Sequence, residues 1–353
     1  MNRIRPYIEL AQNFLIDLYC VRTGSRRFRP LMTNFYVTKK CNLRCRYCYP
    51  PGDEPSLPTD AAVGLLDKIR PCNPALNITG GEPLMHPGIS AILRRAHELA
   101  FRPLLLSTNG LLLERVSDDL RLVDHVVISL DSAGAATNDL MCGRRGATPK
   151  VLAAIRRAAE LSRDYGFELS LHSVIAPETI PGIEEILALC EEVGAQLSLS
   201  PEHGRYDPLP ALRTDPDYRS LLERLIDLKA KGRPVFCSAA YLRAIRDFVP
   251  HGCYPWVSPR VEPDGRVYFP CQRMRERWVY LQDYPSLYEL MQRETEWITE
   301  PRCANRCFLA CYLEVERYFD HPLTVMENLP LRQLLIRGKR TPVGERRSQA
   351  TNA

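Results

Sequence analysis

Three cysteines lie close together near the start of the chain, at Cys41, Cys45 and Cys48. Cysteine thiolates hold iron–sulfur clusters, and a four-iron cluster usually takes four of them. Three thiolates in one loop would leave one iron open to a small chelating molecule. A zinc knuckle is the alternative, but zinc sites favour paired C-x2-C units with a fourth ligand nearby. The spacing therefore favours an iron–sulfur cluster over zinc.

A second group of cysteines lies near the other end of the chain. Its five thiols could hold one four-cysteine cluster with one to spare, and structural zinc is again the alternative. The last three are spaced four residues apart, which on a helix would bring them toward one face. The five are Cys253, Cys271, Cys303, Cys307 and Cys311.

Short apolar runs rich in β-forming residues alternate with stretches of helical periodicity. Strands in series with intervening helices predict a parallel sheet. Because no glycine-rich dinucleotide fingerprint follows the first run, a partial (βα)6 TIM-like barrel is expected rather than a Rossmann sheet. The first cysteine group then lies where such barrels build their active sites. The runs cover 31–38, 75–79, 104–107, 125–130, 168–175 and 196–200, and the helical stretches 60–70, 88–100, 148–164 and 181–193.

The pattern changes after about residue 235. Two apolar runs, 257–261 and 266–269, flank Pro263-Asp264-Gly265, which predicts a β-hairpin, and a helical stretch follows near 286–298. We expect a small C-terminal α+β domain that holds the second cysteine group. The basic, polar end of the chain is expected to fray. The predicted parts are an N-terminal helix and linker (1–30), a core barrel (31–235), the iron–sulfur domain (236–325) and the tail (326–353).

An amphipathic helix is predicted before the barrel. Apolar residues recur at helical spacing between Tyr7 and Tyr19, with Glu9, Gln12, Asn13 and Asp17 on the opposite side. The expected arrangement packs the apolar face on the barrel. The alternative is contact with a membrane surface that supplies a lipid substrate.

Composition excludes several classes of protein. The 353 residues are 45% hydrophobic and 25% charged, which excludes wholesale disorder, collagen-like repeats and a heptad rod. A net charge of +5 does not indicate nucleic-acid binding. Early charges argue against a secretory signal, and no run of about 18 apolar residues predicts a membrane span. We therefore expect a cytoplasmic protein. The alternative is a peripheral position at the membrane surface, held there by the N-terminal amphipathic helix.

Short motifs follow the first four predicted strands, and together they resemble the radical S-adenosylmethionine (SAM) superfamily. The first cysteines form its C-x3-C-x2-C signature, with Tyr47 as the usual aromatic before the last one. Residues 79–84 (TGGEPL), 107–110 (STNG) and 129–131 (SLD) are similar to its GGEP, STNG and SLD segments. All of them occur in the family's order, over most of residues 31–200.

The resemblance implies cofactors and residues that bind them. SAM would bind the open iron of a [4Fe–4S] cluster, and one electron would cleave it to methionine and a 5′-deoxyadenosyl radical. A flavodoxin- or ferredoxin-type protein would supply the electron. Glu82 and nearby carbonyls would accept from the SAM amino group, and Arg144 would meet its carboxylate. The implied cofactor-binding residues are Tyr47, Gly80, Gly81, Glu82, Pro83, Ser107, Asn109, Ser129, Asp131 and Arg144.

The C-terminal cysteines resemble the twitch, or shortened SPASM, region of some radical SAM enzymes. That resemblance implies one auxiliary [4Fe–4S] cluster. The segments around Cys253, Gly265 and Cys271 are also similar to the adenosylhopane synthase branch, although the last triad is C-x3-C-x3-C instead of that branch's C-x2-C-x3-C.

The predicted function is a radical SAM enzyme that modifies a small molecule or a lipid in a biosynthetic pathway. About 30 residues precede the barrel, which is too few for a separate leader-peptide domain. The alternatives are a peptide- or protein-modifying maturase with a separate recognition partner, and a non-catalytic iron–sulfur sensor. The other cysteines are expected to be buried apolar residues. Cys142 is the exception, because a thiol near the active-site mouth could donate a hydrogen atom to a substrate radical.

Overall fold

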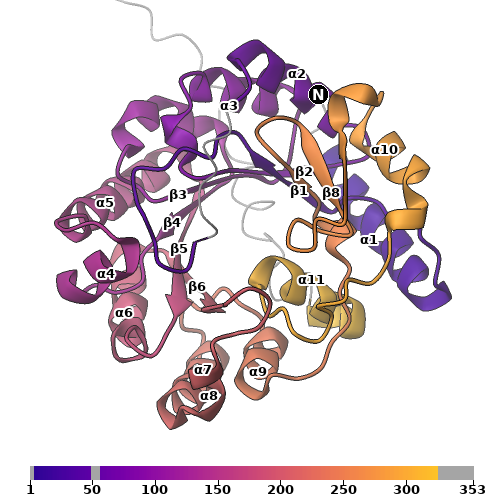
Figure 1. Ribbon diagram of the computed structural model, residues 1–353. Helices are drawn as coiled ribbons and strands as arrows, with labels where there is room; N and C mark the ends of the chain where they lie inside the picture. The colour runs from indigo at the N-terminus through magenta and orange to yellow at the C-terminus, as the bar shows by residue number, and fades with distance from the viewer. Residues whose placement is uncertain (1–3, 49–55, 325–353) are drawn as a thin grey trace, which may run out of the picture.

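The computed structural model of the protein describes residues 4–48 and 56–324. Its strands form one open sheet in the order β6-β5-β4-β3-β2-β1-β7-β8-β9 (Figure 1). The first six are parallel neighbours, which confirms the predicted partial barrel. They are β1 (Met32–Tyr36), β2 (Ala75–Thr79), β3 (Leu104–Thr108), β4 (His125–Ser129), β5 (Glu168–Ile175) and β6 (Gln196–Pro201).

Helices cover the outer face of this sheet (Figure 1). The strands alternate, so that Phe35, Ile78 and Leu106 are buried in the main core on the helix side. Four helices fall where periodicity predicts them: α2 (Thr59–Ile69), α3 (Ile89–Glu98), α5 (Thr148–Tyr165) and α6 (Ile183–Val193). A 3-10 segment, Leu113–Leu122, follows β3, and the helices not predicted are α4 (Ala135–Cys142), α7 (Pro210–Thr214), α8 (Pro216–Ala230) and α9 (Ala239–Asp247).

The C-terminal hairpin belongs to the same sheet as the barrel strands. Strand β7 (Arg260–Val261) pairs in parallel with β1, and β8 (Arg266–Phe269) and β9 (Arg277–Tyr280) continue in antiparallel pairing. Gly265 has a φ of +84° in the turn between β7 and β8, a conformation that favours glycine. The first hairpin strand is shorter than predicted, because Pro255–Val257 form a 3-10 turn.

The last described segments are two short helices and the turns between them. Helix α10 (Leu287–Arg293) ends earlier than predicted, and α11 spans Ala310–Asp320. Cys303 lies in a turn and Cys307 in an irregular segment, both before α11, so the expectation of three cysteines on one helix is wrong. Asn305, between them, has a left-handed φ of +68°, which a continuous helix cannot accommodate.

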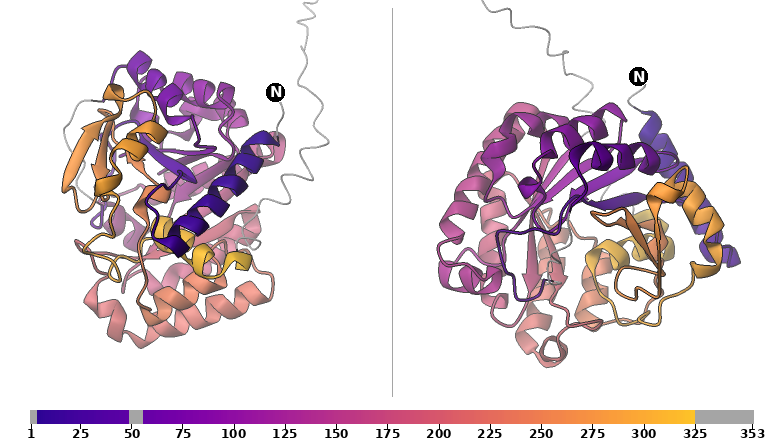
Figure 2. Two further views of the ribbon diagram at one scale, coloured as in Figure 1. Left: turned by 90° about the vertical axis from the view of Figure 1, so that its right-hand side faces the viewer. Right: turned by 45° about the horizontal axis from the view of Figure 1, so that its top comes forward.

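The N-terminal helix α1 (Arg5–Thr23) forms as predicted and lies against the rest of the protein (Figure 2). Its inward face differs in part from the predicted one: Leu10, Phe14 and Leu18 pack against the core, but polar residues are buried there as well. Asn13 and Asp17 are buried on the inside, whereas Leu15 and Tyr19 of the predicted apolar face are exposed. Asn13 Nδ2 donates to the carbonyls of Pro30 (2.9 Å) and Cys72 (2.8 Å). The backbone of the chain entering β1 and β2 needs acceptors and donors, and these polar side chains supply them. The prediction that the apolar face packs inward is therefore wrong for these residues.

None of the described helices is long and apolar enough to cross a membrane. The predicted tail, 326–353, lies outside the described residues.

Asp17 predicts an unusual dependence of stability on pH. Its Oδ1 accepts from the Arg29 amide (2.8 Å), but Oδ2 has no hydrogen-bond partner among the described residues. Burial raises the pKa of Asp17 to about 8 from an ordinary value of 3.8. The folded chain thus keeps a proton that the unfolded chain loses near pH 4, so this group makes stability fall as pH rises from about 4 to 8.

Replacing Asp17 by Asn should remove this loss. As the pH rises from 5 to 9, the free energy of unfolding of the variant should increase relative to that of the wild type by a few kcal/mol, with about 4 kcal/mol as an upper bound. Urea unfolding at both pH values measures the difference. Glu9→Gln is the control. It removes another carboxylate of α1, which is half-buried and paired with Arg70, and it should leave the dependence of stability on pH unchanged. An unchanged slope in Asp17→Asn would contradict the assignment.

Candidate functional site

The loop after β1 carries the first cysteine group across the carboxyl ends of the parallel strands (Figure 1). Its middle is bonded to the end of α4: the Arg44 amide donates to the Cys142 carbonyl (3.0 Å) and the Arg46 amide to the Met141 carbonyl (3.1 Å). Gly143, with a φ of +67°, makes this approach possible, because a Cβ there would collide with the Arg44 carbonyl. The loop thus rests on the C-terminus of α4.

The glycine pair after β2 holds the beginning of the same loop. The amide of Gly81 donates to the Thr38 carbonyl (2.8 Å) and that of Glu82 to the Lys40 carbonyl (2.8 Å). A Cβ on Gly81 would lie 2.5 Å from the carbonyl oxygens of Lys39 and Lys40. The glycines therefore let one stretch of backbone approach another, whereas the sequence suggested an approach to the ligand.

Glu82 joins the ends of β2 and β3. Its buried carboxylate accepts from the Leu84 amide (3.0 Å), the Thr108 hydroxyl (2.7 Å) and the Asn109 amide (2.7 Å). Burial raises the pKa of Glu82, and these three hydrogen bonds oppose the rise. Both carboxylate oxygens are thus engaged by protein groups. Pro83, the next residue, is buried in the 3-10 turn Pro83–Met85.

Asn109 contacts the cysteine loop directly. Its Nδ2 donates to Asn42 Oδ1 (2.7 Å) and lies 3.9 Å from Cys41 Sγ. The Leu43 amide also donates to Cys41 Sγ (3.4 Å). Hydrogen bonds to a cysteine sulfur stabilise its thiolate and tune a cluster bound to it.

Residues beside Cys45 fasten the loop to β4, β5 and β6. The Tyr47 hydroxyl donates to Asp131 Oδ2 (2.6 Å), and Asp131 Oδ1 accepts from the Val174 amide (2.9 Å). Burial raises the pKa of Asp131 to about 6, against the effect of these hydrogen bonds. Arg46 donates to both oxygens of Glu178 (2.8 and 2.6 Å) and to Glu202 (2.8 Å). Sequence analysis missed Arg46, although an arginine between two candidate ligands was a visible signal.

The three thiols of the loop lie near one another, at the accessible end of the barrel. Cys41 and Cys45 are half-buried and Cys48 is exposed. Burial, and then the nearby charges of Asp131, Cys48 and Cys41, raise the pKa of Cys45 to about 12. No group of three or more His, Cys, Asp or Glu among the described residues has the geometry of a single-ion site. A four-iron cluster binds each thiolate at a different iron, so it does not require that geometry.

The remaining candidates lie around this loop. Ser129 is exposed at the end of β4, and Arg144 is exposed with Nη1 donating to the Asn42 carbonyl (3.1 Å). Cys142 is 6% exposed and packs with Leu43 against Cys41 and Cys45. Its thiol lies 3.7 Å from the carbonyls of Asp139 and Arg144.

A row of polar side chains crosses the sheet on the face opposite the helices. Ser107 donates to Asn77 (2.9 Å), Asn77 to Asn34 (2.9 Å) and Asn34 to Ser258 (3.0 Å). The first three are half-buried. Their alternation with buried apolar residues in β1, β2 and β3 was a signal that sequence analysis did not use.

Farther along the same face, His172 is hydrogen-bonded to the hydroxyls of Ser198 (2.9 Å) and Ser200 (3.1 Å). Burial lowers the pKa of His172 to about 4, so its ring is neutral at pH 7.

Four cysteines of the second group are buried together. Cys253, Cys271, Cys303 and Cys307 are each at most 7% exposed. A hydrogen bond between Cys303 and Cys271 lowers the pKa of Cys271 and raises that of Cys303, which burial and the charges of Cys271, Cys307 and Cys253 raise further. The structure thus brings these four thiols into one neighbourhood. Cys311 is at the start of α11, and its side chain lies outside the described part.

A buried ion pair lies between the two cysteine groups. Arg260 packs over the Tyr36 ring (3.4 Å to its centre), and its Nε lies 2.7 Å from Glu262 Oε1. The pKa of Cys48 is raised by partial desolvation of its thiol and by the charge of Cys41, and the charge of Arg260 opposes this rise. Arg260 also interacts with Tyr312, beside Cys303 and Cys307. Arg260 was not recognised from the sequence.

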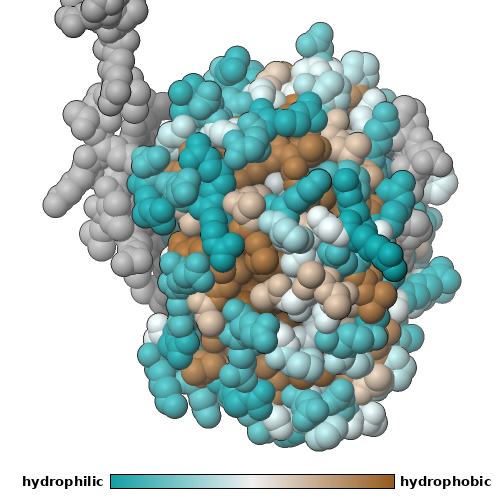
Figure 3. All heavy atoms as spheres, turned by 90° about the vertical axis from the view of Figure 1, so that its left-hand side faces the viewer, coloured by the Kyte–Doolittle hydropathy of each residue, from teal (hydrophilic) through white to brown (hydrophobic). Residues whose placement is uncertain are grey.

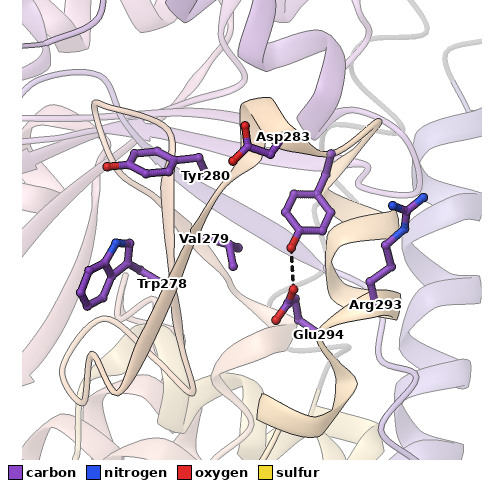
Figure 4. A pocket seen from close by; sticks show the side chains of 7 residues that line it. Trp278, Val279, Tyr280, Asp283, Arg293 and Glu294 are labelled. Carbon is purple, nitrogen blue, oxygen red and sulfur yellow. Dashed lines mark hydrogen bonds between the residues drawn. The ribbon is translucent and has the colours of Figure 1, made fainter.

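Surface hollows lie both away from this arrangement and beside it. One, between β9 and α10, is lined by Trp278, Tyr280 and Arg293 among others, and the Tyr284 hydroxyl donates to Glu294 in it (2.5 Å; Figure 4). None of the predicted site residues lines it. The other runs along α4, where Leu140, Arg144 and Arg145 line it beside the cysteine loop.

Part of the chain matches a known protein family. Residues 35–170 match the model of the radical SAM superfamily. They form a radical SAM domain, which confirms the superfamily predicted from the motifs.

Particular relatives cover only parts of the chain. The pre-heme d1 synthase of Dinoroseobacter shibae is 33% identical over 166 residues, 45% of this chain and 40% of that protein. An AdoMet-dependent heme synthase of Methanosarcina barkeri is 26% identical over 233 residues, 62% of this chain and 64% of that protein. A GTP 3′,8-cyclase of Rhodococcus opacus is 30% identical over 205 residues, 55% of this chain and 56% of that protein. The chain thus spans less than two thirds of each relative, and these relatives are enzymes by name.

Solved structures share the fold. Streptococcus suis SuiB bound to S-adenosylmethionine superposes with a TM-score of 0.60 at 18% identity, covering 74% of this chain and 65% of SuiB. A histidine-tagged anSMEcpe with bound AdoMet gives a TM-score of 0.56 at 19% identity, covering 86% of this chain and 98% of that chain.

Arg46 provides a test of how the cysteine loop is positioned. Arg46→Met would leave Glu202 buried without its cation and release the loop from β5 and β6. We expect the variant to lose iron to a chelator about 10- to 100-fold more readily, the range typical of residues that orient metal ligands. The loss of iron is followed by the EPR signal of the reduced cluster, which is recognised because it changes when SAM is added. Arg145→Met, which removes an exposed arginine, is the control. Equal iron retention in both variants would exclude a positioning role for Arg46.

Proposed function

We propose that the protein is a radical SAM enzyme that reductively cleaves SAM and uses the resulting radical to modify a small molecule or a lipid in a biosynthetic pathway. One observation carries the proposal. The cysteine loop is held at the carboxyl ends of the strands by the three other motif segments, through Gly81 and Glu82, Asn109, and Asp131. Four separate motifs thus meet at one place, where a βα barrel carries its chemistry.

Cys41, Cys45 and Cys48 would hold the SAM-binding [4Fe–4S] cluster. The donor set fits, because three soft thiolates lie near one another on a single loop and one of them accepts two N–H groups. When bound, the cluster would supply one electron to the sulfonium of SAM. The chain's own groups position the loop, partly shield Cys41 and Cys45 from water, and would supply hydrogen-bonding atoms to SAM.

Residues around the loop would hold SAM. Ser129 is exposed and offers a hydroxyl, and Tyr47 and Asp131 form a preorganised pair beside it. Because Glu82 already accepts three hydrogen bonds, nearby backbone carbonyls are the better acceptors for the amino group of SAM. Arg144 remains our proposed partner of the SAM carboxylate. Cys142 remains a proposed hydrogen-atom donor, and its backbone carbonyl supports the loop in any case.

The second cysteine group would hold an auxiliary [4Fe–4S] cluster. Cys253, Cys271, Cys303 and Cys307 supply the four thiolates that such a cluster usually takes. Their burial would shield the cluster from solvent. Arg260 lies between the two groups. Its positive charge would interact with both clusters and with a substrate.

The inner face of the sheet favours a substrate with hydrogen-bonding groups. Asn34, Asn77 and Ser107 are half-buried amides and hydroxyls on this face, and His172 adds a neutral ring. These groups already bond to one another or to neighbouring serines, but each amide has more donor and acceptor positions than those bonds use, and a purely apolar ligand that displaced water would leave the remaining positions unsatisfied, which costs free energy. We therefore propose a polar small molecule, or the polar part of a lipid.

The electron would come from a flavodoxin- or ferredoxin-type protein. Two exposed arginines, Arg144 and Arg145, line the hollow on α4 together with Asp139 and Leu140. Exposed Arg44 lies on the neighbouring cysteine loop. Hydrophobic patches lie between hydrophilic side chains on this side of the molecule (Figure 3). Three arginines near an exposed leucine suit an acidic donor protein.

The central test is the formation of 5′-deoxyadenosine. Protein reconstituted anaerobically with iron and sulfide should produce it from SAM and a strong reductant. A Cys41→Ala, Cys45→Ala and Cys48→Ala variant should produce none, because no ligand for the cluster remains. Cys72→Ala, a half-buried cysteine elsewhere, should behave like the wild type. A fully loaded, reducible cluster that never cleaves SAM, even with candidate substrates present, would favour the iron–sulfur sensor.

Iron analysis of the same proteins tests the second cluster. We expect about eight iron atoms per chain in the wild type and about four in the triple variant. Replacing Cys253, Cys271, Cys303 and Cys307 by Ala should remove the other four and keep the signal that responds to SAM. Stoichiometric zinc with about four iron atoms in the wild type would show that the second site is a zinc site.

A further inference from the structure

Helix α1 presents a line of exposed apolar side chains that the proposed function does not use. Ile4, Ile8, Leu15 and Tyr19 are 55%, 50%, 63% and 65% exposed, and they are half of the exposed large hydrophobic residues in the described part of the chain. At 100° per residue, the four lie within an arc of about 60° around the helix. We call them the α1 stripe. Isolated apolar residues need no explanation, but an aligned set of this kind marks an interaction surface.

The stripe is exposed because the opposite face of α1 is committed to the protein. Asn13 is bonded to the Pro30 and Cys72 carbonyls, and Asp17 to the Arg29 amide. Phe14 stacks on Phe319 of α11 with ring centres 5.5 Å apart. These contacts fix the rotation of the helix, so the stripe cannot turn inward without losing them.

The charged residues of α1 nearest the stripe, and those of the segment that follows α1, are arginines. Two of them also donate to backbone carbonyls, Arg22 to that of Phe319 and Arg26 to that of Glu296 (both 3.5 Å). Arg5 lies beside its beginning, and Arg22 continues the same line one turn beyond Tyr19, followed by exposed Arg26 and Arg27. The two carboxylates of α1 are directed elsewhere, since Glu9 pairs with Arg70 (2.9 Å) and Asp17 is buried. The outer surface of the helix is therefore apolar and cationic.

We propose that α1 docks this protein on the surface of an anionic lipid bilayer. Apolar side chains would enter the boundary between headgroups and acyl chains, Tyr19 would lie at the polar level, and the arginines would meet lipid phosphates and carboxylates. The helix is already folded and packed, so binding carries no cost of helix formation. Its 19 residues are about 28 Å long, which suits a helix lying in the plane of the surface.

The position of α1 separates this surface from the chemistry. Asn13 bonds to residues that precede β1 and β2, which places the helix at the amino end of the strands. The cysteine loop lies at their carboxyl end. Docking through α1 would therefore hold the protein at a membrane while leaving the opening beside the cysteines unobstructed. The proposal does not depend on the reaction that the protein catalyses.

Co-sedimentation with vesicles tests the proposal on the full chain. We expect binding to phosphatidylcholine vesicles that contain phosphatidylserine, much weaker binding to pure phosphatidylcholine, and weakening by salt, because exposed charges are screened. Ile8→Gln with Leu15→Gln should lower the partition coefficient at least about 10-fold, since burying a leucine side chain favours transfer by more than a factor of ten. Arg22→Gln with Arg26→Gln should lower binding only to the anionic vesicles.

Leu140→Gln is the matched control, because Leu140 is 60% exposed on α4, away from α1. Unchanged thermal unfolding would show that the variants fold. The proposal is overturned by absence of binding to the anionic vesicles, or by equal binding of the Ile8/Leu15 variant and the wild type. It is also overturned if the wild type is a dimer by light scattering and this variant is a monomer, since the stripe would then join two copies of the chain.

Discussion

In the described part of the cysteine loop, most backbone-to-backbone hydrogen bonds join the loop to other segments, so its shape depends on close backbone contacts from its surroundings. Two glycines make these contacts possible. Gly81 brings the segment after β2 against the start of the loop, and Gly143 brings the end of α4 against its middle. Any side chain at either position would collide with a loop carbonyl. The placement of the three thiolates therefore depends on two positions where only glycine fits.

A second level of support comes from polar side chains that cross between strand ends. Glu82, Asp131 and Arg46 each join the loop or its supports to another strand. All three combine a charge with several hydrogen bonds, which is the condition under which a buried or half-buried charge is tolerated. In this network each charged group contacts more than one element. Loss of one group would therefore disturb contacts at several strand ends.

Much of this arrangement could be predicted from the sequence, because the barrel has strong local signals. The six strands and four of the helices follow from periodicity, and the motifs lie at strand ends where the fold requires them. Side-chain partners were less predictable. The use of Glu82 between β2 and β3, and the burial of Asn13 and Asp17 in α1, depend on backbone groups distant in sequence. Hydrophobic pattern alone cannot reveal that an amide and a carboxylate are drawn inward to satisfy those groups. The turn at Asn305 is similar, since a left-handed residue leaves little trace in the spacing of cysteines.

The pairing of β7 with β1 has a consequence for how this chain can be divided. The residues that match the family model, 35–170, begin within β1 (Met32–Tyr36) and end before β7, the strand that pairs with its other edge. A fragment cut before the hairpin would expose β1 as an unprotected edge, with its backbone donors and acceptors open to other chains. Such edges promote aggregation. The two cysteine-bearing parts therefore share one continuous sheet. Neither could be transferred to another protein without redesign of the pairing between β1 and β7.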